Sequence, residues 1–167
     1  FAALGKPAPR YGHHSLILAP DGGKLSKRHG ATSIGDFSRL GYLPGAMVNY
    51  LALLSWHPSD EREKFSLEEL IDEFDIDRVS KSPAIFDVQK LSWLNGLYIR
   101  ELEATALYQA IEPYLAEADM QFAPVQREVV AEAVQANLVV LSDAPRFADI
   151  FVEDFDLADC ECNEWLR

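Results

Sequence analysis

From Leu43 onward, apolar residues recur at the spacing of α-helices rather than of β-strands. Pro44 suits the first turn of a helix that continues through residues 46–54. This segment is apolar almost all round, which predicts a helix at the centre of the core. Pro58 disfavours a helical conformation at His57, so we expect the helix to end there.

Two further helices are indicated by their first residues. Ser66 and Glu69 form a capping box, and an apolar stripe follows at helical spacing. The stripe consists of Leu67, Leu70, Ile71 and Phe74. Asp87 can cap the second helix, whose apolar residues are Val88, Leu91 and Leu94. We expect Asn95 and Gly96 to stop this helix, because glycine suits the left-handed position after a helix end.

Three more helices are predicted after residue 100. The first covers residues 103–118, the second begins at Pro124, and the third is capped by Ser142 and Asp143. Their expected apolar faces are, in turn, Leu107, Ile111, Tyr114 and Leu115; Val125, Val129, Ala133, Val134, Leu138 and Leu141; and Phe147, Ile150 and Phe151. We therefore expect everything beyond residue 40 to be helical and the fold class to be mainly α.

Residues 1–36 differ, because glycines, prolines and short apolar runs predict a strand, a loop and a turn. The apolar residues 16–18 lead into residues 23–32, where three cations and a hydroxyl lie between glycines. Lysine is a mobile point charge that can follow phosphate oxygens, so this loop is suited to a polyphosphate. A solvated loop or a general nucleic-acid patch would also explain the same residues.

Charge is distributed unevenly along the chain, whose net charge is −12. Residues 1–50 carry six Lys or Arg against two Asp or Glu, whereas residues 101–167 carry three against fifteen. An acidic surface repels phosphates, so any RNA contact there must depend on a few placed residues, and we expect no DNA partner. No run of 18 apolar residues exists, and we expect no membrane partner.

Cys160 and Cys162 are separated by one residue. Such a pair makes a poor structural disulfide and supplies only half of a zinc site. We expect free thiols in a reducing cytoplasm, with metal binding as the alternative. No other metal site is predicted.

The pentapeptide formed by residues 24–28, KLSKR, resembles the KMSKS loop of class I aminoacyl-tRNA synthetases. Four further blocks, at residues 41–44, 49–54, 79–84 and 87–100, follow it in an order and spacing that closely resemble bacterial glutamyl-tRNA synthetases. The resemblance covers residues 1–151. The histidine-bearing HIGH motif of the family is absent, so we expect a C-terminal fragment that lacks the HIGH-motif part.

The resemblance implies three regions. Residues 1–38 would form the C-terminal edge of a class I catalytic domain with its KLSKR loop, and residues 39–100 a helical stem-contact region. Residues 101–167 would form the first, incomplete helical subdomain for anticodon binding. The intact enzyme would activate L-glutamate with ATP and Mg²⁺ and transfer it to tRNA(Glu) in the cytoplasm. A non-catalytic paralogue that binds tRNA or another protein is the alternative.

The resemblance also suggests roles for individual residues. Lys27 would be the catalytic residue, because its ammonium can stabilise the charge that develops on pyrophosphate as it leaves. The ATP-binding set would be Lys24, Leu25, Ser26, Lys27 and Arg28. Lys81, Lys90 and Arg100 are predicted contacts to the tRNA backbone, with salt bridges on helix surfaces as the alternative.

Four other side chains are expected to be structural. Aromatic residues at helical spacing are more often core than platforms for stacking bases, so we place Trp56, Trp93 and Tyr98 in the core. His13 occupies a position where the family often has histidine, and we expect a partly buried structural residue there.

Overall fold

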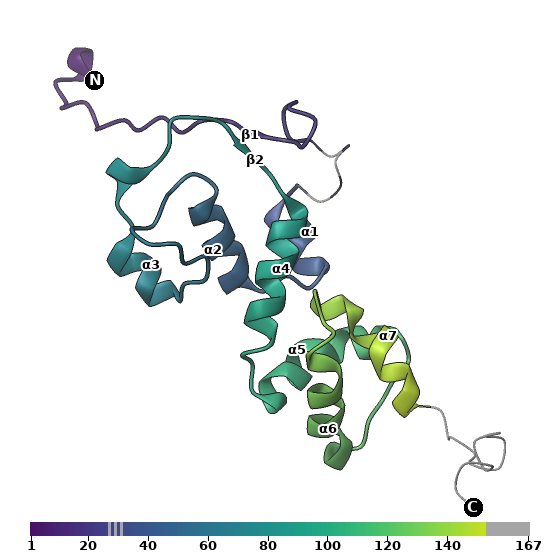
Figure 1. Ribbon diagram of the computed structural model, residues 1–167. Helices are drawn as coiled ribbons and strands as arrows, with labels where there is room; N and C mark the ends of the chain where they lie inside the picture. The colour runs from purple at the N-terminus through teal and green to yellow at the C-terminus, as the bar shows by residue number, and fades with distance from the viewer. Residues whose placement is uncertain (27, 29, 31, 153–167) are drawn as a thin grey trace, which may run out of the picture. The chain divides into compact units, whose positions relative to one another are not determined.

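The structure is a computed structural model that describes residues 1–26, 28, 30 and 32–152 (Figure 1). It is mainly helical, as the sequence predicts. By compactness the chain divides into two units, one made of residues 1–32 and 48–88 and the other of residues 33–47 and those from 89 onward. The three functional regions drawn from the family resemblance are a different division, and that division stays a prediction.

The first unit contains a two-stranded parallel sheet and two helical segments. Strands β1 (Ile17–Leu18) and β2 (Ala84–Ile85) lie side by side, with Ile17 opposite Ala84 and Leu18 opposite Ile85 (Figure 1). Helix α2 (Pro44–Leu53) enters the unit from residue 48, and α3 (Leu67–Glu73) follows. Short 3₁₀ turns cover Ala2–Leu4 and Ile76–Arg78. The presence of β2 corrects the expectation that everything beyond residue 40 is helical.

The core of the first unit is small and aromatic. One cluster in it consists of buried Trp56, Phe65 and Leu70, and the rings of Trp56 and Phe65 meet edge to face with centroids 5.7 Å apart. Ala19, Tyr50 and Phe86 are also buried in this unit. Trp56 is thus a core residue, as predicted. In α2 the buried apolar residues are Ala46, Met47 and Tyr50, whereas Val48 and Leu51 are exposed. Helix α2 is therefore buried on one face, not all round as its composition suggested.

A buried asparagine ties α2 to the chain that precedes α3. The side-chain oxygen of Asn49 accepts from the backbone N–H of Phe65 at 2.8 Å, and its amide donates to the carbonyl of Glu63 at 3.2 Å. Asn49 has no exposed surface, so both bonds lie in a poorly hydrated setting where unpaired groups would be costly.

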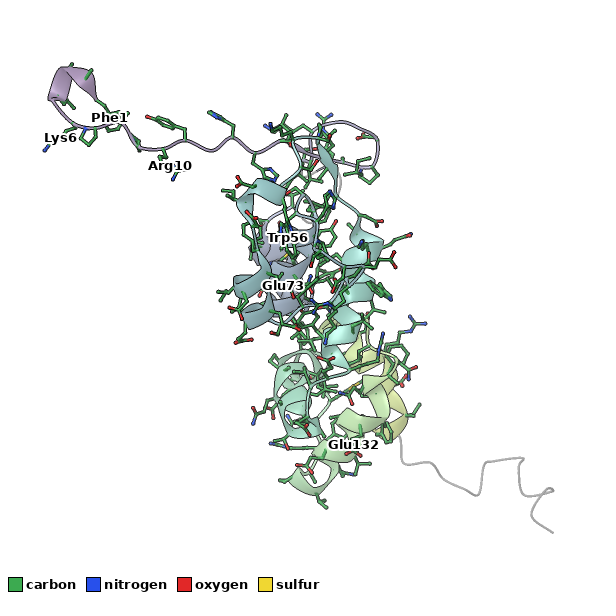
Figure 2. The ribbon with its side chains drawn as sticks, turned by 60° about the vertical axis from the view of Figure 1, so that its left-hand side comes forward. Phe1, Lys6, Arg10, Trp56, Glu73 and Glu132 are labelled. Atoms are coloured by element: carbon green, nitrogen blue, oxygen red, sulfur yellow. The ribbon has the colours of Figure 1, made fainter. Side chains whose placement is uncertain are left out.

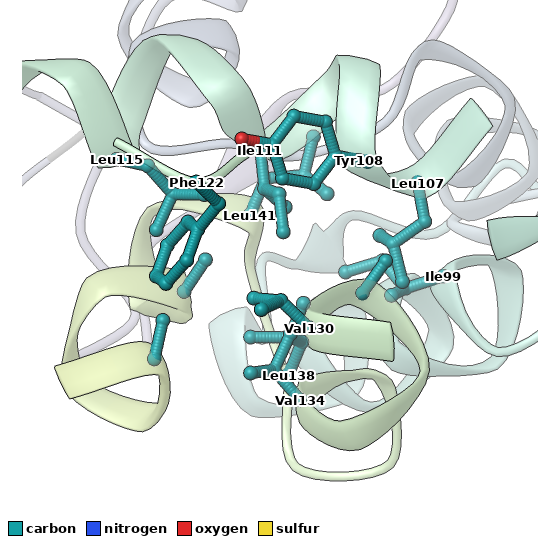
Figure 3. Close-up of a cluster of buried hydrophobic side chains, with 13 residues drawn as sticks. Ile99, Leu107, Tyr108, Ile111, Leu115, Phe122, Val130, Val134, Leu138 and Leu141 are labelled. Carbon is teal, nitrogen blue, oxygen red and sulfur yellow. The ribbon is translucent and has the colours of Figure 1, made fainter. Parts of the chain in front are cut away.

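The second unit holds the larger core. It contains α1 (Ile34–Arg39), α4 (Val88–Ile99), α5 (Ala104–Glu117), α6 (Pro124–Gln135) and α7 (Ala144–Ala148), with 3₁₀ turns at Leu141–Asp143 and Asp149–Phe151. Figure 3 shows the side chains that α5 and α6 direct at one another, among them Ile111 and Val130. Residues from α4, α7 and the turn at Leu141 complete the cluster. Packing of amphipathic helices therefore stabilises this unit.

Residues 38–42 are held against the turn at residues 141–142. The N–H of Leu141 donates to the carbonyl of Gly41 at 3.0 Å, and Ser142 Oγ donates to the carbonyl of Leu40 at 2.8 Å. Gly41 has a φ of +86°, and a Cβ built on it would lie 2.6 Å from the Leu141 nitrogen. Only glycine satisfies both the backbone conformation and this close approach.

Helix α4 does not stop where the sequence indicated. It continues through Asn95 and Gly96 to Ile99, because Asn95 finds partners outside the helix. Its side-chain oxygen accepts from the N–H of Leu43 at 2.8 Å, and its amide donates to the carbonyl of Val139 at 2.7 Å. Trp93, expected in the core, is 47% exposed, whereas Tyr98 is half-buried.

The apolar faces of three other helices also differ from expectation. In α6 the buried residues are Val130, Ala131 and Val134, while Val125 and Val129 are exposed. Leu138 and Leu141 are buried but lie beyond the end of α6. In α3 only Leu70 of the predicted stripe is buried, and in the last helical segment Ile150 is exposed. Helix α5 has the predicted face, with Leu107, Ile111 and Leu115 fully buried and Tyr114 half-buried.

Candidate functional site

The cationic loop begins at a tight hairpin that follows β1. Leu18 and Lys24 form an antiparallel bridge, and the N–H of Ala19 donates to the carbonyl of Gly23 at 2.7 Å. Asp21 accepts from the N–H of Gly23 at 2.8 Å, and Gly22 adopts a φ of +80°. The hairpin therefore fixes the backbone at Lys24, where the KLSKR pentapeptide starts.

The structure describes four of the five predicted ATP-binding residues. Lys24 and Arg28 are exposed, so both cationic side chains are open to a ligand. Leu25 and Ser26 are half-buried, and the N–H of Leu25 faces the carbonyl of Ile17 at 3.5 Å. Lys27, the predicted catalytic residue, lies outside the described residues.

The hairpin stands on an anchor, which we define as residues 80–87. Ser15 Oγ donates to the carbonyls of Lys81 and Ser82, at 3.0 and 2.9 Å. The parallel pairing of β1 with β2 and the bond from the N–H of Phe86 to the carbonyl of Leu18, 2.8 Å long, continue the contact. The anchor thus supports the strand that leads into the loop, although some 66 residues separate the two in sequence.

The anchor is in turn fixed to α2. The Tyr50 hydroxyl accepts from the N–H of Asp87 at 2.7 Å, and its ring meets that of Phe86 edge to face at 5.2 Å. Burial raises the pKa of Tyr50 to about 12, so the phenol is neutral at physiological pH. A chain of contacts therefore connects α2, the anchor and the hairpin within one compact unit.

His14 adds a second connection that the sequence did not suggest. Its Nε2 lies 2.6 Å from Ser55 Oγ, and its Nδ1 lies 2.7 Å from the carbonyl of Ser15. Ser55 is buried just after α2, so His14 joins the start of β1 to the same helix. His13, by contrast, is exposed and not partly buried as expected.

The three predicted tRNA contacts fall in both units. Lys81 belongs to the anchor and is exposed. Lys90 is half-buried on α4, and Arg100 is exposed directly after that helix. Ten residues separate Lys90 from Arg100, which corresponds to about 15 Å along a helix axis. The two side chains would therefore meet different phosphates of a bound strand.

Among residues 1–26, 28, 30 and 32–152, no three His, Cys, Asp or Glu side chains are grouped as a metal site would require. Cys160 and Cys162 lie outside the described residues. In the same part of the chain, no helix is long and apolar enough to cross a membrane.

A known protein family matches the part of the chain that contains the loop. The family described as class I tRNA synthetases (E and Q), catalytic domain, matches residues 1–93, which include the hairpin, the loop and the anchor. The chain belongs to this family. The resemblance to glutamyl-tRNA synthetases is thereby confirmed.

Proteins that are similar to this chain are named glutamate–tRNA ligase or glutamate–tRNA synthetase. The glutamate–tRNA ligase of Carboxydothermus hydrogenoformans is 44% identical over 159 residues, which cover 92% of this chain and 33% of that protein. Glutamate–tRNA ligase 1 of Rubrobacter xylanophilus is 50% identical over 147 residues, or 87% of this chain and 33% of that protein. The crystal structure of the Elizabethkingia anophelis glutamate–tRNA synthetase matches with a TM-score of 0.78 at 30% identity, covering 90% of this chain and 34% of that one. The chain spans about a third of the length of these relatives.

Proposed function

We propose that these residues serve a glutamate–tRNA ligase, an enzyme that activates L-glutamate with ATP and transfers it to tRNA(Glu) in the cytoplasm. The observation that carries the proposal is the hairpin and its anchor, because they lie inside the matched catalytic family and present a cationic loop on a fixed base. Named relatives at 42–50% identity support the choice of glutamate.

In the proposed reaction, the carboxylate of glutamate attacks the α-phosphorus of ATP and pyrophosphate leaves. Negative charge then builds on the leaving phosphates, and a lysine that closes on them stabilises the transition state more than the ground state. We assign this role to Lys27, with Lys24 and Arg28 adding positive charge around it. The hydroxyl of the terminal ribose of tRNA then attacks the glutamyl carbonyl, and AMP leaves.

The chemistry of this step requires no covalent bond to the enzyme. Lysines 24 and 27 act through charge. In this account Mg²⁺ enters with ATP as part of the substrate, and its charge is balanced by the phosphates. The protein's part is to hold its cationic side chains near the phosphates of ATP.

Transfer to tRNA requires contacts away from the reacting atoms. We assign contacts with the phosphate backbone of tRNA to Lys81 in the first unit and to Lys90 and Arg100 in the second. Sparse cations suit this task because each one neutralises a single phosphate, and binding should weaken with salt accordingly. A broad basic field is not needed.

The test is charging of tRNA(Glu) by the intact protein with glutamate, glutamine or aspartate. The proposal predicts ATP-dependent charging with glutamate alone. The competing proposal is a non-catalytic paralogue that binds tRNA or another protein. Binding of tRNA(Glu) without charging by any of the three amino acids would support the paralogue and overturn ours.

A further inference from the structure

Helix α3 leaves an apolar face uncovered in the first unit. Leu67, Ile71, Phe74 and Ile76 are 54%, 70%, 47% and 73% exposed. We call these four residues the α3 stripe. Leu67 and Ile71 are four residues apart and share one side of α3, and Phe74 follows directly after the helix ends. Exposed apolar residues that line up in this way, bordered by polar ones, mark interaction surfaces more often than single exposed residues do.

The helix that carries the stripe is firmly held on its other side. Ser66 and Glu69 form the predicted capping box, and Leu70 is buried against Trp56 and Phe65. Arg62 binds Glu69 at 3.1 Å and also pairs with Glu73 and, at 2.6 Å, with Asp60. Trp56 lies inside the unit and Glu73 on α3 in Figure 2. The stripe is therefore presented by an ordered helix with both flanks fixed.

Carboxylates border the stripe on its solvent side. Glu68 and Asp72 are exposed on α3, and Asp75 and Asp77 are exposed in the turn that follows. With 3.6 residues per turn, Glu68 and Asp72 lie about 100° further round the helix than Leu67 and Ile71. The surface thus pairs an apolar row with an acidic row.

We propose that the α3 stripe docks an amphipathic helix of a partner protein, with apolar residues on one face and Lys or Arg along its edge. Apolar contact would supply affinity, and the acidic row would select a basic partner and speed its approach. Nucleic acid and anionic lipid are disfavoured because their phosphates would face carboxylates. An antiparallel pairing of α3 with a second copy of this chain is disfavoured too, because its two-fold axis would place acidic row against acidic row.

The direct test is isothermal titration of the intact protein with a synthetic peptide. The peptide has about 18 residues, long enough to form a helix, with leucines at helical spacing and lysines beside them. We expect one peptide to bind, with roughly tenfold weaker binding to the Leu67→Ser/Ile71→Ser variant. The matched control, Val125→Ser/Val129→Ser, changes two exposed valines of α6 and should bind within about twofold of wild type.

Charge is tested separately from apolar contact. A peptide with glutamates in place of its lysines should not bind, and neither should one with serines in place of its leucines. Equal weakening by the α3 and α6 variants, or binding of the serine peptide as tightly as the leucine peptide, would overturn the proposal. Both variants change exposed residues, and unchanged thermal unfolding verifies that they fold.

An internal reporter locates the bound peptide. The Phe74 ring lies 5.7 Å from the Trp56 ring, so docking on the stripe should change Trp56 emission in a background where every other tryptophan of the intact protein, Trp93 and Trp165 included, is replaced by Phe. Unchanged emission on saturation would overturn the assignment. Self-association that Ile71→Ser abolishes, or binding of a single-stranded RNA that Leu67→Ser/Ile71→Ser abolishes, would assign the surface to those partners instead.

Discussion

The two compact units differ in what holds them together. One cluster of the second unit contains thirteen buried residues, supplied mainly by α5 and α6, whereas the cluster around Trp56 in the first unit contains three, and Ala19, Tyr50 and Phe86 are buried outside it. In the first unit, polar contacts also join distant segments, such as Ser15 with the anchor and His14 with Ser55. Packing between helices can be predicted from apolar residues at helical spacing, while single polar contacts leave little trace in a sequence.

The largest expected effect contrasts two glycines of positive φ. Gly41→Ala in the second unit must place a Cβ 2.6 Å from the Leu141 nitrogen. Backbone strain and overpacking together should lower the free energy of unfolding by about 3–5 kcal/mol. Gly22→Ala in the first unit meets no atom within 4 Å and should cost only about 1–2 kcal/mol. Urea unfolding measures both, and equal losses would contradict the close approach.

Asn49 and Asn95 are both buried, one in each unit, so the same substitution can be compared between the units. Asn49→Ala removes the hydrogen bonds to the N–H of Phe65 and the carbonyl of Glu63 in the first unit, and Asn95→Ala removes those to the N–H of Leu43 and the carbonyl of Val139 in the second. Each should lose about 2–4 kcal/mol. The exposed Asn137→Ala should lose less than about 0.5 kcal/mol. If Asn49→Ala resembles Asn137→Ala in thermal unfolding, polar contacts do not hold the first unit.

Alkaline pH should weaken the contact of α2 with the anchor. Because the folded pKa of Tyr50 is raised to about 12, its contribution is complete below pH 10 and is lost as pH rises from 10 to 12. The loss should be roughly 2 kcal/mol. In Tyr50→Phe the unfolding free energy should fall less steeply over this range. Tyr108 and Tyr114 also have raised pKa values through burial, so some slope remains. If the unfolding free energy of Tyr50→Phe falls with pH as steeply as that of the wild type, Tyr50 does not cause the loss of stability at alkaline pH.

Much of the second unit was predictable, and the errors have physical causes. The stripe of α5 is set by local spacing and appeared as expected. Asn95 and Gly96 carry a local stop signal, but tertiary partners of Asn95 outweigh it. Val129 and Trp93 were assigned to the core from residue type and helical spacing, although the burial of a helix face depends on what packs against it.

Less of the first unit was predictable. A two-residue strand such as β2 exists only through its partner β1, which is far away in sequence. Charge and glycine alone indicate residues 23–32 as a possible polyphosphate loop, and the choice of residues 24–28 rests on the family resemblance. The anchor that supports the loop and the contacts of His14 could be identified only from the folded structure.

The smallest expected effect concerns the base of the loop. Ser15→Ala removes a hydroxyl that serves two carbonyls and should cost about 0.5–1.5 kcal/mol, since the site is exposed. The exposed Ser59→Ala is the matched control and should cost almost nothing. Hydrogen exchange should speed up in residues 16–25 of the first variant alone. Faster exchange throughout the chain in both would contradict a local role for the anchor.

The most direct test of the account is the rate of pyrophosphate release by the intact protein with glutamate, ATP and tRNA(Glu). We predict that Lys27→Ala slows release by roughly 10²–10³-fold and leaves the affinity for tRNA within about twofold. Lys6→Ala, which removes an exposed lysine near the start of the chain, should match wild type. Release by Lys27→Ala at the wild-type rate would contradict the claim that the anchored loop presents a lysine to the phosphates of ATP.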